Sequence, residues 1–151
     1  MVRSTYLNLW KVSKIKMFTI PQILAHVIGD YFIQSDWMAL NKQQKSIQGW
    51  LAVTVHAITY TLPFLLITRS PLALAIICVS HLLIDHFKLA SYICWAKNFF
   101  APKSWWHPWS KCKDTFGYHP DRPVFITIWL MIIVDNTIHI IINGLSIYYL
   151  G

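Results

Sequence analysis

Three apolar segments of the sequence each carry a histidine and an aspartate four residues apart. Residues i and i+4 of an α-helix lie on one face, one turn apart, so each pair presents two polar groups in the same direction. Such groups are costly inside an apolar membrane helix, and a functional role is the usual reason for their presence. His56 contributes a further imidazole from another apolar segment. The three pairs are His26/Asp30, His81/Asp85 and Asp135/His139.

The segments that must position these residues are long enough to cross a lipid bilayer. A helix needs about 20 apolar residues to span the hydrocarbon layer. Short connections between successive spans favour an up-and-down arrangement. We therefore predict an all-α polytopic membrane protein, an antiparallel four-transmembrane-helix bundle that forms a single membrane domain over residues 1–151. The predicted spans are approximately residues 17–40, 50–68, 72–95 and 124–150, with a long loop at 97–123.

The composition supports a membrane location. Hydrophobic residues make up 56% of the chain and charged residues 13%, whereas a soluble domain carries about 25% charged residues. The formal net charge of +7 is typical of lysines and arginines that face lipid headgroups. The sequence contains no compact basic cluster of the kind that binds nucleic acid. We expect the lipid bilayer to be the main partner and no nucleic acid to be bound.

The N-terminal residues 1–16 mix basic and apolar side chains, and no small-residue cleavage site follows the next apolar run. This pattern predicts an N-terminal interfacial segment, either a helix or a basic tail on the headgroups, rather than a cleaved signal peptide. The sequence has 3 cysteines and no C-x-x-C pair, which predicts neither a disulfide framework nor a cysteine zinc site. The distribution of lysine and arginine leaves the orientation in the membrane open.

The order of the pairs along the chain points to one shared site. We call the end of the bundle that holds residues 41–49 and the long loop face X. The first and third spans run toward face X and carry His before Asp, whereas the fourth runs away from it and carries Asp before His. In each pair the Asp therefore lies nearer face X and the His lies one turn deeper. The groups predicted at this common depth are His26, Asp30, His56, His81, Asp85, Asp135 and His139.

Three carboxylates close together inside a membrane need a partner that offsets their charge. A divalent cation does so directly, and the mixed nitrogen and oxygen donors suit zinc first, with manganese or iron as alternatives. We predict all seven residues as the metal site, and we predict Asp30, Asp85 and Asp135 as its catalytic carboxylates. Seven groups exceed the ligands of one tetrahedral zinc, so they could hold two ions or one ion with an outer shell. A proton or ion relay and purely structural polar packing are the alternatives.

Three flanking residues are candidates for substrate binding or for the outer shell of the site. Gln34 lies one turn from Asp30 toward face X, and His86 and Lys88 lie near the end of the third span. Helix packing would account for Gln34 equally well, and extension toward the headgroups is the usual explanation for His86 and Lys88. In the long loop, His107 and His119 are each followed by proline, which favours a role in turns over metal binding. This tryptophan-rich loop is typical of an interfacial aromatic belt, and it could cover the site.

The motif A-H-x-x-x-D-Y-x-x-Q at Ala25 to Gln34, followed by the segment SDWMALNK, resembles a family of bacterial and phage membrane proteins catalogued as domain of unknown function 3307. The resemblance covers the first two spans and continues to the later His/Asp pairs. The resemblance implies the fold and the importance of these polar residues. It also implies a location in the bacterial inner membrane, or in the host inner membrane if the protein is encoded by a phage. A more distant likeness is to bacterial membrane-bound metal-dependent hydrolases, whose H-R-G-x-T-H-S segment is absent here.

Three functions are compatible with these residues. In the first, the protein is a membrane-embedded metal-dependent hydrolase that acts on a lipid or a lipid phosphate, with the ion activating a water molecule. In the second, the same residues carry protons or divalent metals in a transporter or channel, which in a chain of 151 residues would require a homo-oligomer. In the third, the chain is a non-catalytic phage or bacterial membrane protein that modulates an envelope complex.

Overall fold

The computed structural model describes residues 17–151, and all regular secondary structure in that range is helical. The predicted interfacial segment at residues 1–16 lies outside the described residues. The α-helices are α1 (Ile20–Val27), α2 (Asp36–Asn41), α3 (Ile47–Thr61), α4 (Pro71–His86), α5 (Leu89–Ala96), α6 (Trp109–Cys112) and α7 (Val124–Leu150). The remaining helical turns are the π-helix η1 (Ile28–Ile33) and the 3₁₀ turns η2 (Leu62–Leu66), η3 (Lys97–Phe100) and η4 (Lys103–Trp105).

Two helices of the described chain are long and apolar enough to cross a membrane. One is the continuous helix Ile47–Leu66, formed by α3 and η2, and the other is α7 with 27 residues. The helix pair Pro71–His86 and Leu89–Phe100 counts as a third span only if its 67° bend lies within the membrane. The first apolar helix, Ile20–Ile33, is shorter. The prediction of four complete spans is therefore reduced to two or three.

The predicted first span ends early because polar residues start a new helix. Helix α1 widens into the π-helix η1, which contains Asp30, and the chain becomes extended at Gln34. The Ser35 side chain then accepts a hydrogen bond from the backbone N–H of Met38 and caps α2. The π-helix is a rare form that is frequent at functional sites. The predicted first span is thus broken close to the aspartate of the first pair.

The predicted third span is broken at a residue with left-handed backbone conformation. Lys88 has φ 54° and ψ 41°, and it separates α4 from α5. A left-handed residue terminates an α-helix, and this conformation is uncommon for a side chain other than glycine, asparagine or aspartate. The chain changes direction there by 67°, so α5 does not continue along the axis of α4.

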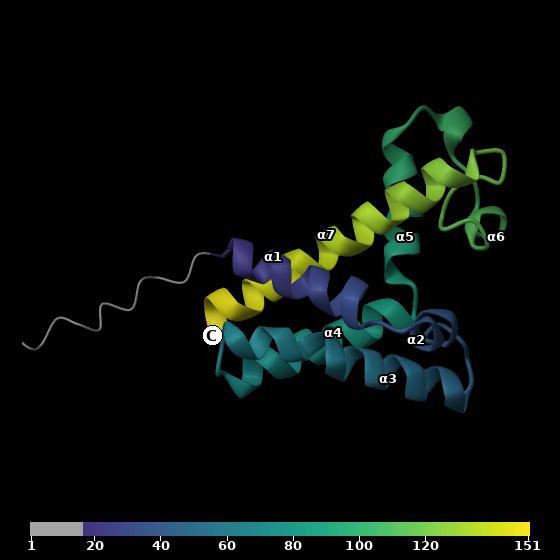
Figure 1. Ribbon diagram of the computed structural model, residues 1–151. Helices are drawn as coiled ribbons and strands as arrows, with labels where there is room; N and C mark the ends of the chain where they lie inside the picture. Colours follow the sequence, from purple (N-terminus) through teal and green to yellow (C-terminus); the bar gives the residue numbers. More distant parts are fainter. Residues whose placement is uncertain (1–16) are drawn as a thin grey trace, which may run out of the picture.

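Helix α7 connects the two parts of the fold (Figure 1). Its C-terminal half lies beside α1, and its N-terminal half crosses α5 near the loop that contains α6. Helices α3 and α4 pack against each other, α4 also packs against α7, and α2 covers part of α3. The helices α1, α3, α4 and α7 consequently surround the level at which the His/Asp pairs lie.

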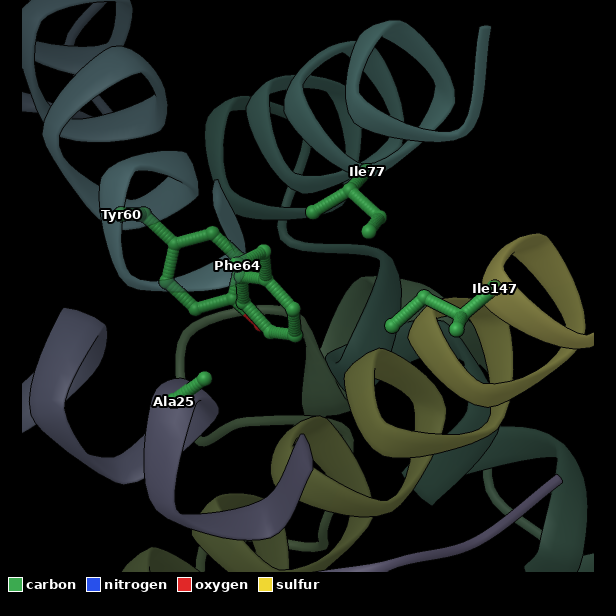
Figure 2. Packing of buried hydrophobic residues seen from close by; sticks show 5 residues of the cluster. All are labelled: Ala25, Tyr60, Phe64, Ile77 and Ile147. Carbon is green, nitrogen blue, oxygen red and sulfur yellow. The ribbon is translucent and has the colours of Figure 1, made fainter. Parts of the chain in front are cut away.

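A small apolar core lies next to the polar level (Figure 2). Tyr60 at the end of α3, Phe64 in η2 and Ile77 in the middle of α4 are fully buried, and Ala25 and Ile147 complete the cluster from α1 and α7. In contrast, Ile47 is 91% exposed and Leu66 is 90% exposed at the two ends of the Ile47–Leu66 helix. Large exposed apolar side chains on a span-length helix are what contact with lipid requires.

Candidate metal centre

The members of each His/Asp pair contact each other, as their spacing on a helix predicts. His26 lies on α1 and Asp30 on η1, the second pair lies near the end of α4, and the third lies in the middle of α7. The separations are 3.3 Å from His26 Nδ1 to Asp30 Oδ2, 3.3 Å from His81 Nε2 to Asp85 Oδ2, and 3.7 Å from His139 Nε2 to Asp135 Oδ2.

Asp30, His56 and His81 form a group that could hold a metal ion. They come from three different elements, η1, α3 and α4. Asp30 Oδ1 lies 3.3 Å from His56 Nε2 and 3.4 Å from His81 Nε2, and the two nitrogens are 2.9 Å apart. Ligand bonds of 2.0–2.1 Å in a tetrahedral zinc site keep the ligand atoms about 3.3 Å from one another. The three donors are therefore close to the spacing of one face of such a site.

His81, Asp85 and His139 form a second group that could hold a metal ion. Asp85 Oδ2 lies 3.3 Å from His81 Nε2, and Asp85 Oδ1 lies 3.4 Å from His139 Nε2. All three side chains are buried. The two groups meet at His81, because its Nε2 atom is close to donors of both.

Buried ring nitrogens without hydrogen-bond partners surround this site. Among the described residues, His56 Nδ1, His81 Nδ1 and His139 Nε2 have none. A buried polar atom left unpaired costs about 1–3 kcal/mol. His139 Nε2 lies 3.4 Å from Asp85 Oδ1 and has no hydrogen-bond partner, so this nitrogen is free either to bind an ion or to orient the carboxylate.

Lys42 places an ammonium group against the carboxylate of Asp85. Its Nζ donates hydrogen bonds of 2.6 Å to both Asp85 Oδ2 and Gln34 Oε1, and it lies 3.4 Å from His56 Nε2. Its backbone carbonyl accepts a hydrogen bond of 2.9 Å from His86 Nδ1, which fixes the chain after α2. Lys42 was not among the residues expected at the site, because a lysine in a polar connection usually faces solvent.

Hydrogen bonds occupy both ring nitrogens of His26. Its Nε2–H donates to Asn136 Oδ1 at 2.9 Å, and its Nδ1 lies 2.8 Å from the Tyr60 hydroxyl. Asn143 Nδ2 donates to the same hydroxyl at 2.6 Å. The Tyr60 ring stacks on His81 with 3.6 Å between ring centroids. His26 and Tyr60 thus connect Asn136 and Asn143 of α7 with the side chains on α3 and α4.

The spacing of residues in the sequence did not predict Asn136, Tyr60 and Asn143 as parts of the site, for the following reasons. The Asn136 side chain leaves α7 in a different direction from the Asp135 side chain. Helical periodicity therefore did not predict that Asn136 belongs to the common site. In the structure α1 lies on that other side of α7, and the Tyr31 hydroxyl also contacts the Asn136 amide, at 2.7 Å from Nδ2. Buried tyrosine and asparagine in apolar spans were the available signal for Tyr60 and Asn143.

A cavity of about 170 Å³ opens onto the cluster. The carboxylates of Asp30, Asp85 and Asp135 line it together with Lys42 and Lys88. Asp135 is the most exposed of the three carboxylates at 28%. The cluster is therefore accessible from the side on which the lysines lie, where a small polar or anionic group could reach it.

The other candidate residues have different surroundings. Gln34 holds Lys42, as described above, and the buried ring of His86 also packs on Trp50 with 4.0 Å between centroids. His107 and His119 stack on each other at 4.0 Å between centroids in the long loop, in a separate pocket that contains neither group of candidate ligands. Desolvation lowers the pKa of His107, and the neighbouring His119 lowers it further.

Comparison with known proteins agrees with the motif at Ala25 to Gln34. The model of a family of proteins of unknown function, DUF3307, matches residues 18–149. The chain belongs to the DUF3307 family. No curated protein and no solved structure matches it. The family match includes all seven residues of the predicted site, so the resemblance drawn from the first motif is confirmed for nearly the whole chain.

Proposed function

We propose that this DUF3307 protein is a membrane-embedded metal-dependent hydrolase. The observation that carries the proposal is the group Asp30, His56 and His81, whose donor atoms lie 2.9–3.4 Å apart. Two imidazoles and one carboxylate are a donor set found in catalytic zinc sites, which keep a fourth position for water or substrate. Zinc is the first candidate, and manganese and iron bind similar donors.

In this proposal a single ion is bound by Asp30, His56 and His81. Because the His81 Nε2 atom has one lone pair, it can serve only one of the two overlapping groups at a time. Asp85 and His139 then lie beside the ion, with Asp85 Oδ2 only 3.3 Å from His56 Nε2. We assign Asp85 as the base that accepts a proton, and His139 and Lys42 as the groups that orient it.

The charge balance supports one divalent ion. Three ionised carboxylates and the Lys42 ammonium leave a net charge of −2 at the site when the imidazoles are neutral. An uncompensated charge of that size is strongly disfavoured in a membrane interior. One divalent cation cancels it, whereas two would leave an excess of positive charge.

The chemistry follows from these positions. When bound, the ion would lower the pKa of a water ligand to about 7 and polarise an ester or phosphoryl oxygen. Asp85 would accept the proton, and the buried His26 would limit the movement of Asp30 by packing against it, with 3.3 Å between His26 Nδ1 and Asp30 Oδ2. Asp135 lines the cavity and would contact water or the leaving group. Lys42 and Lys88 would favour a substrate with negative charge, such as a lipid phosphate.

Two observations favour hydrolysis over transport through the same residues. The cavity reaches the carboxylates from one side, while the fully buried Tyr60, Phe64 and Ile77 pack on the other side of the cluster. The hydrogen-bonded chain through His26 ends at Asn136 and Asn143, and amides do not relay protons. A continuous path for protons or ions across the membrane would require an opening through these apolar side chains and a proton-conducting group in place of the two amides.

The metal content of the purified protein tests the proposal. We expect about one zinc per chain in detergent-purified wild type, measured by elemental analysis at neutral pH, and less than about one tenth of that in Asp30→Asn/His81→Ala. The matched control is Asp36→Asn/His119→Ala, which removes the same residue types away from the cluster. Wild-type protein without bound metal after supplementation would exclude the metal site.

Activity is tested separately from metal binding. We expect the zinc-loaded protein in mixed micelles to release phosphate or alcohol from a panel of lipid phosphates and phospholipids, and Asp85→Asn to lose this activity while it keeps its metal. A protein that binds metal but hydrolyses no member of the panel would be a metal-binding membrane protein instead. That result would contradict the hydrolase proposal.

A further inference from the structure

A second and much larger hollow lies beside the cavity of the metal centre. This groove has a volume of about 1140 Å³. Its walls come from the connection between α2 and α3, the first turn of α3, the corner between α4 and α5, and α6. Gln43, Lys88 and Ser91 line both the groove and the smaller cavity, so the two hollows adjoin at these residues.

The groove is positively charged. Lys45, Lys88 and Lys113 line it from three separate segments, and none of the described residues in its walls is acidic. All three lysines are exposed, and within the described chain none of them forms an ion pair with a carboxylate. Three ammonium groups that line one groove and are not ion-paired form a site for an anion, and a phosphate group suits them through charge-assisted hydrogen bonds.

The same groove has an aromatic wall. Trp50, Phe87 and Tyr92 line it and are each about half exposed, at 46%, 48% and 47%. The Tyr92 ring stacks on Trp109 with 4.3 Å between centroids, which holds α6 against α5. A free phosphate ion would leave this apolar surface uncovered, whereas the glycerol and upper acyl chain of a lipid would cover it.

The position of the groove is suited to a lipid. It includes Ile47 and Trp50, which lie in the first turns of the span-length helix Ile47–Leu66. The end of a membrane span lies at the interface, where aromatic side chains and lysines contact headgroups. The charge and the aromatic wall are therefore at the depth where a phospholipid carries its phosphate and its first methylenes.

We propose that this groove binds one acidic phospholipid, with its anionic headgroup on Lys45, Lys88 and Lys113 and its upper acyl chain against Trp50, Phe87 and Tyr92. This binding site does not depend on metal or on hydrolysis. Because Lys88 belongs to both hollows, the bound lipid has its phosphate next to the entrance of the metal centre.

Native mass spectrometry of the full chain, released from nanodiscs, tests the site. With nanodiscs that contain equal amounts of phosphatidylglycerol and phosphatidylcholine, we expect wild type to retain one phosphatidylglycerol in preference to phosphatidylcholine by about tenfold. Lys45→Gln/Lys88→Gln/Lys113→Gln should lose this preference. Lys97→Gln/Lys103→Gln/Lys111→Gln removes the same charge outside the groove and should keep it.

Two further measurements separate lipid binding in the groove from misfolding and from a general loss of positive charge. Circular dichroism and thermal unfolding establish that the triple variants are folded, and the single exposed changes Lys45→Gln and Lys113→Gln should each weaken the preference. Trp50 fluorescence, taken as the difference between wild type and Trp50→Phe, should be quenched by phosphatidylglycerol brominated near the glycerol. Equal loss in both triple variants, equal retention of the two lipids, or absence of Trp50 quenching would overturn the proposal.

Discussion

At the scale of single residues, the candidate centre depends on charges that come from separate helices. Lys42 stands 43 residues before Asp85 in the sequence and donates to it at 2.6 Å. A cation in that position satisfies Asp85 and opposes a metal ion nearby, because like charges within a few ångströms repel strongly at low dielectric constant. The lysine therefore both supports the carboxylates and limits the affinity of the metal site.

Replacement of Lys42 tests this balance. We expect Lys42→Met to increase the zinc affinity of the purified protein by at least about tenfold, because a positive charge next to the ion is removed. Competition titration with a chromophoric chelator measures the effect. Lys45→Met, which changes an exposed lysine nearby, should leave the affinity unchanged. Weaker zinc binding in Lys42→Met would show that the lysine organises the ligands rather than opposing the ion.

The Tyr60 hydroxyl supports the site without being a ligand. It connects His26 Nδ1 with Asn143 Nδ2, and all three side chains are buried. We expect Tyr60→Phe to reduce the free energy of unfolding by about 1–3 kcal/mol, because two buried partners lose a hydrogen bond. The zinc content should stay at the wild-type value. Denaturant titration in detergent measures stability, with the exposed Tyr149→Phe as the control.

At the scale of elements, the two breaks in the predicted spans shape the site. The π-helix η1 turns Asp30 toward His56 and His81, and the left-handed Lys88 ends α4 soon after Asp85. The close approach of η1 to α3 depends on Gly29. A methyl group there would lie 2.5 Å from Tyr60 Cδ2 and 3.0 Å from the Tyr60 carbonyl oxygen.

Gly29→Ala tests the closeness of η1 and α3. We expect the added methyl group to push the two elements apart, which separates Asp30 from His56 and His81. Overpacking of this kind costs about 1–3 kcal/mol of stability. We expect the zinc content to fall together with the stability. The control Ala75→Ser also adds one heavy atom, on an exposed position of α4, and should change neither. Wild-type zinc content in Gly29→Ala would show that the spacing of η1 and α3 does not control the ligands.

At the scale of the whole molecule, α7 is the longer of the two described helices that are long and apolar enough to cross a membrane. Its 27 residues are long enough to span the hydrocarbon layer with an inclined axis. The shorter helix Ile20–Ile33 and the bent pair α4–α5 pack against it instead of forming independent straight spans. The two ends of α7 are therefore predicted to lie on opposite sides of the membrane.

Epitope tags measure this topology. We expect a tag after Gly151 and a tag inserted at Ser104, in the loop before α7, to be accessible from opposite sides of sealed membrane vesicles. Permeabilised vesicles, in which both tags should bind antibody, provide the control. Access to both tags from the same side would mean that α7 lies along the membrane or returns within it, and the span assignment would be wrong.

Much of the local organisation follows from the sequence. The helical class, the contact within each His/Asp pair and the convergence of residues from several helices were expected from the spacing of polar residues in apolar runs. Helical periodicity and hydropathy are properties of neighbouring residues, so the sequence determines them directly. The four-span bundle was an overestimate because a hydropathy pattern does not register the cap at Ser35 or the left-handed turn at Lys88.

The tertiary structure decided which of these groups meet. The sequence by itself determined that His26, His81 and His139 lie one turn from an aspartate. It did not determine that hydrogen bonds occupy both nitrogens of His26, whereas His81 is shared by two groups of candidate ligands. Those differences, like the contact between Lys42 and Asp85, depend on the distance between helices that are far apart in the chain and on the rotation of each helix about its axis. Such packing is set by side-chain volumes across interfaces, about which periodicity along one segment carries no information.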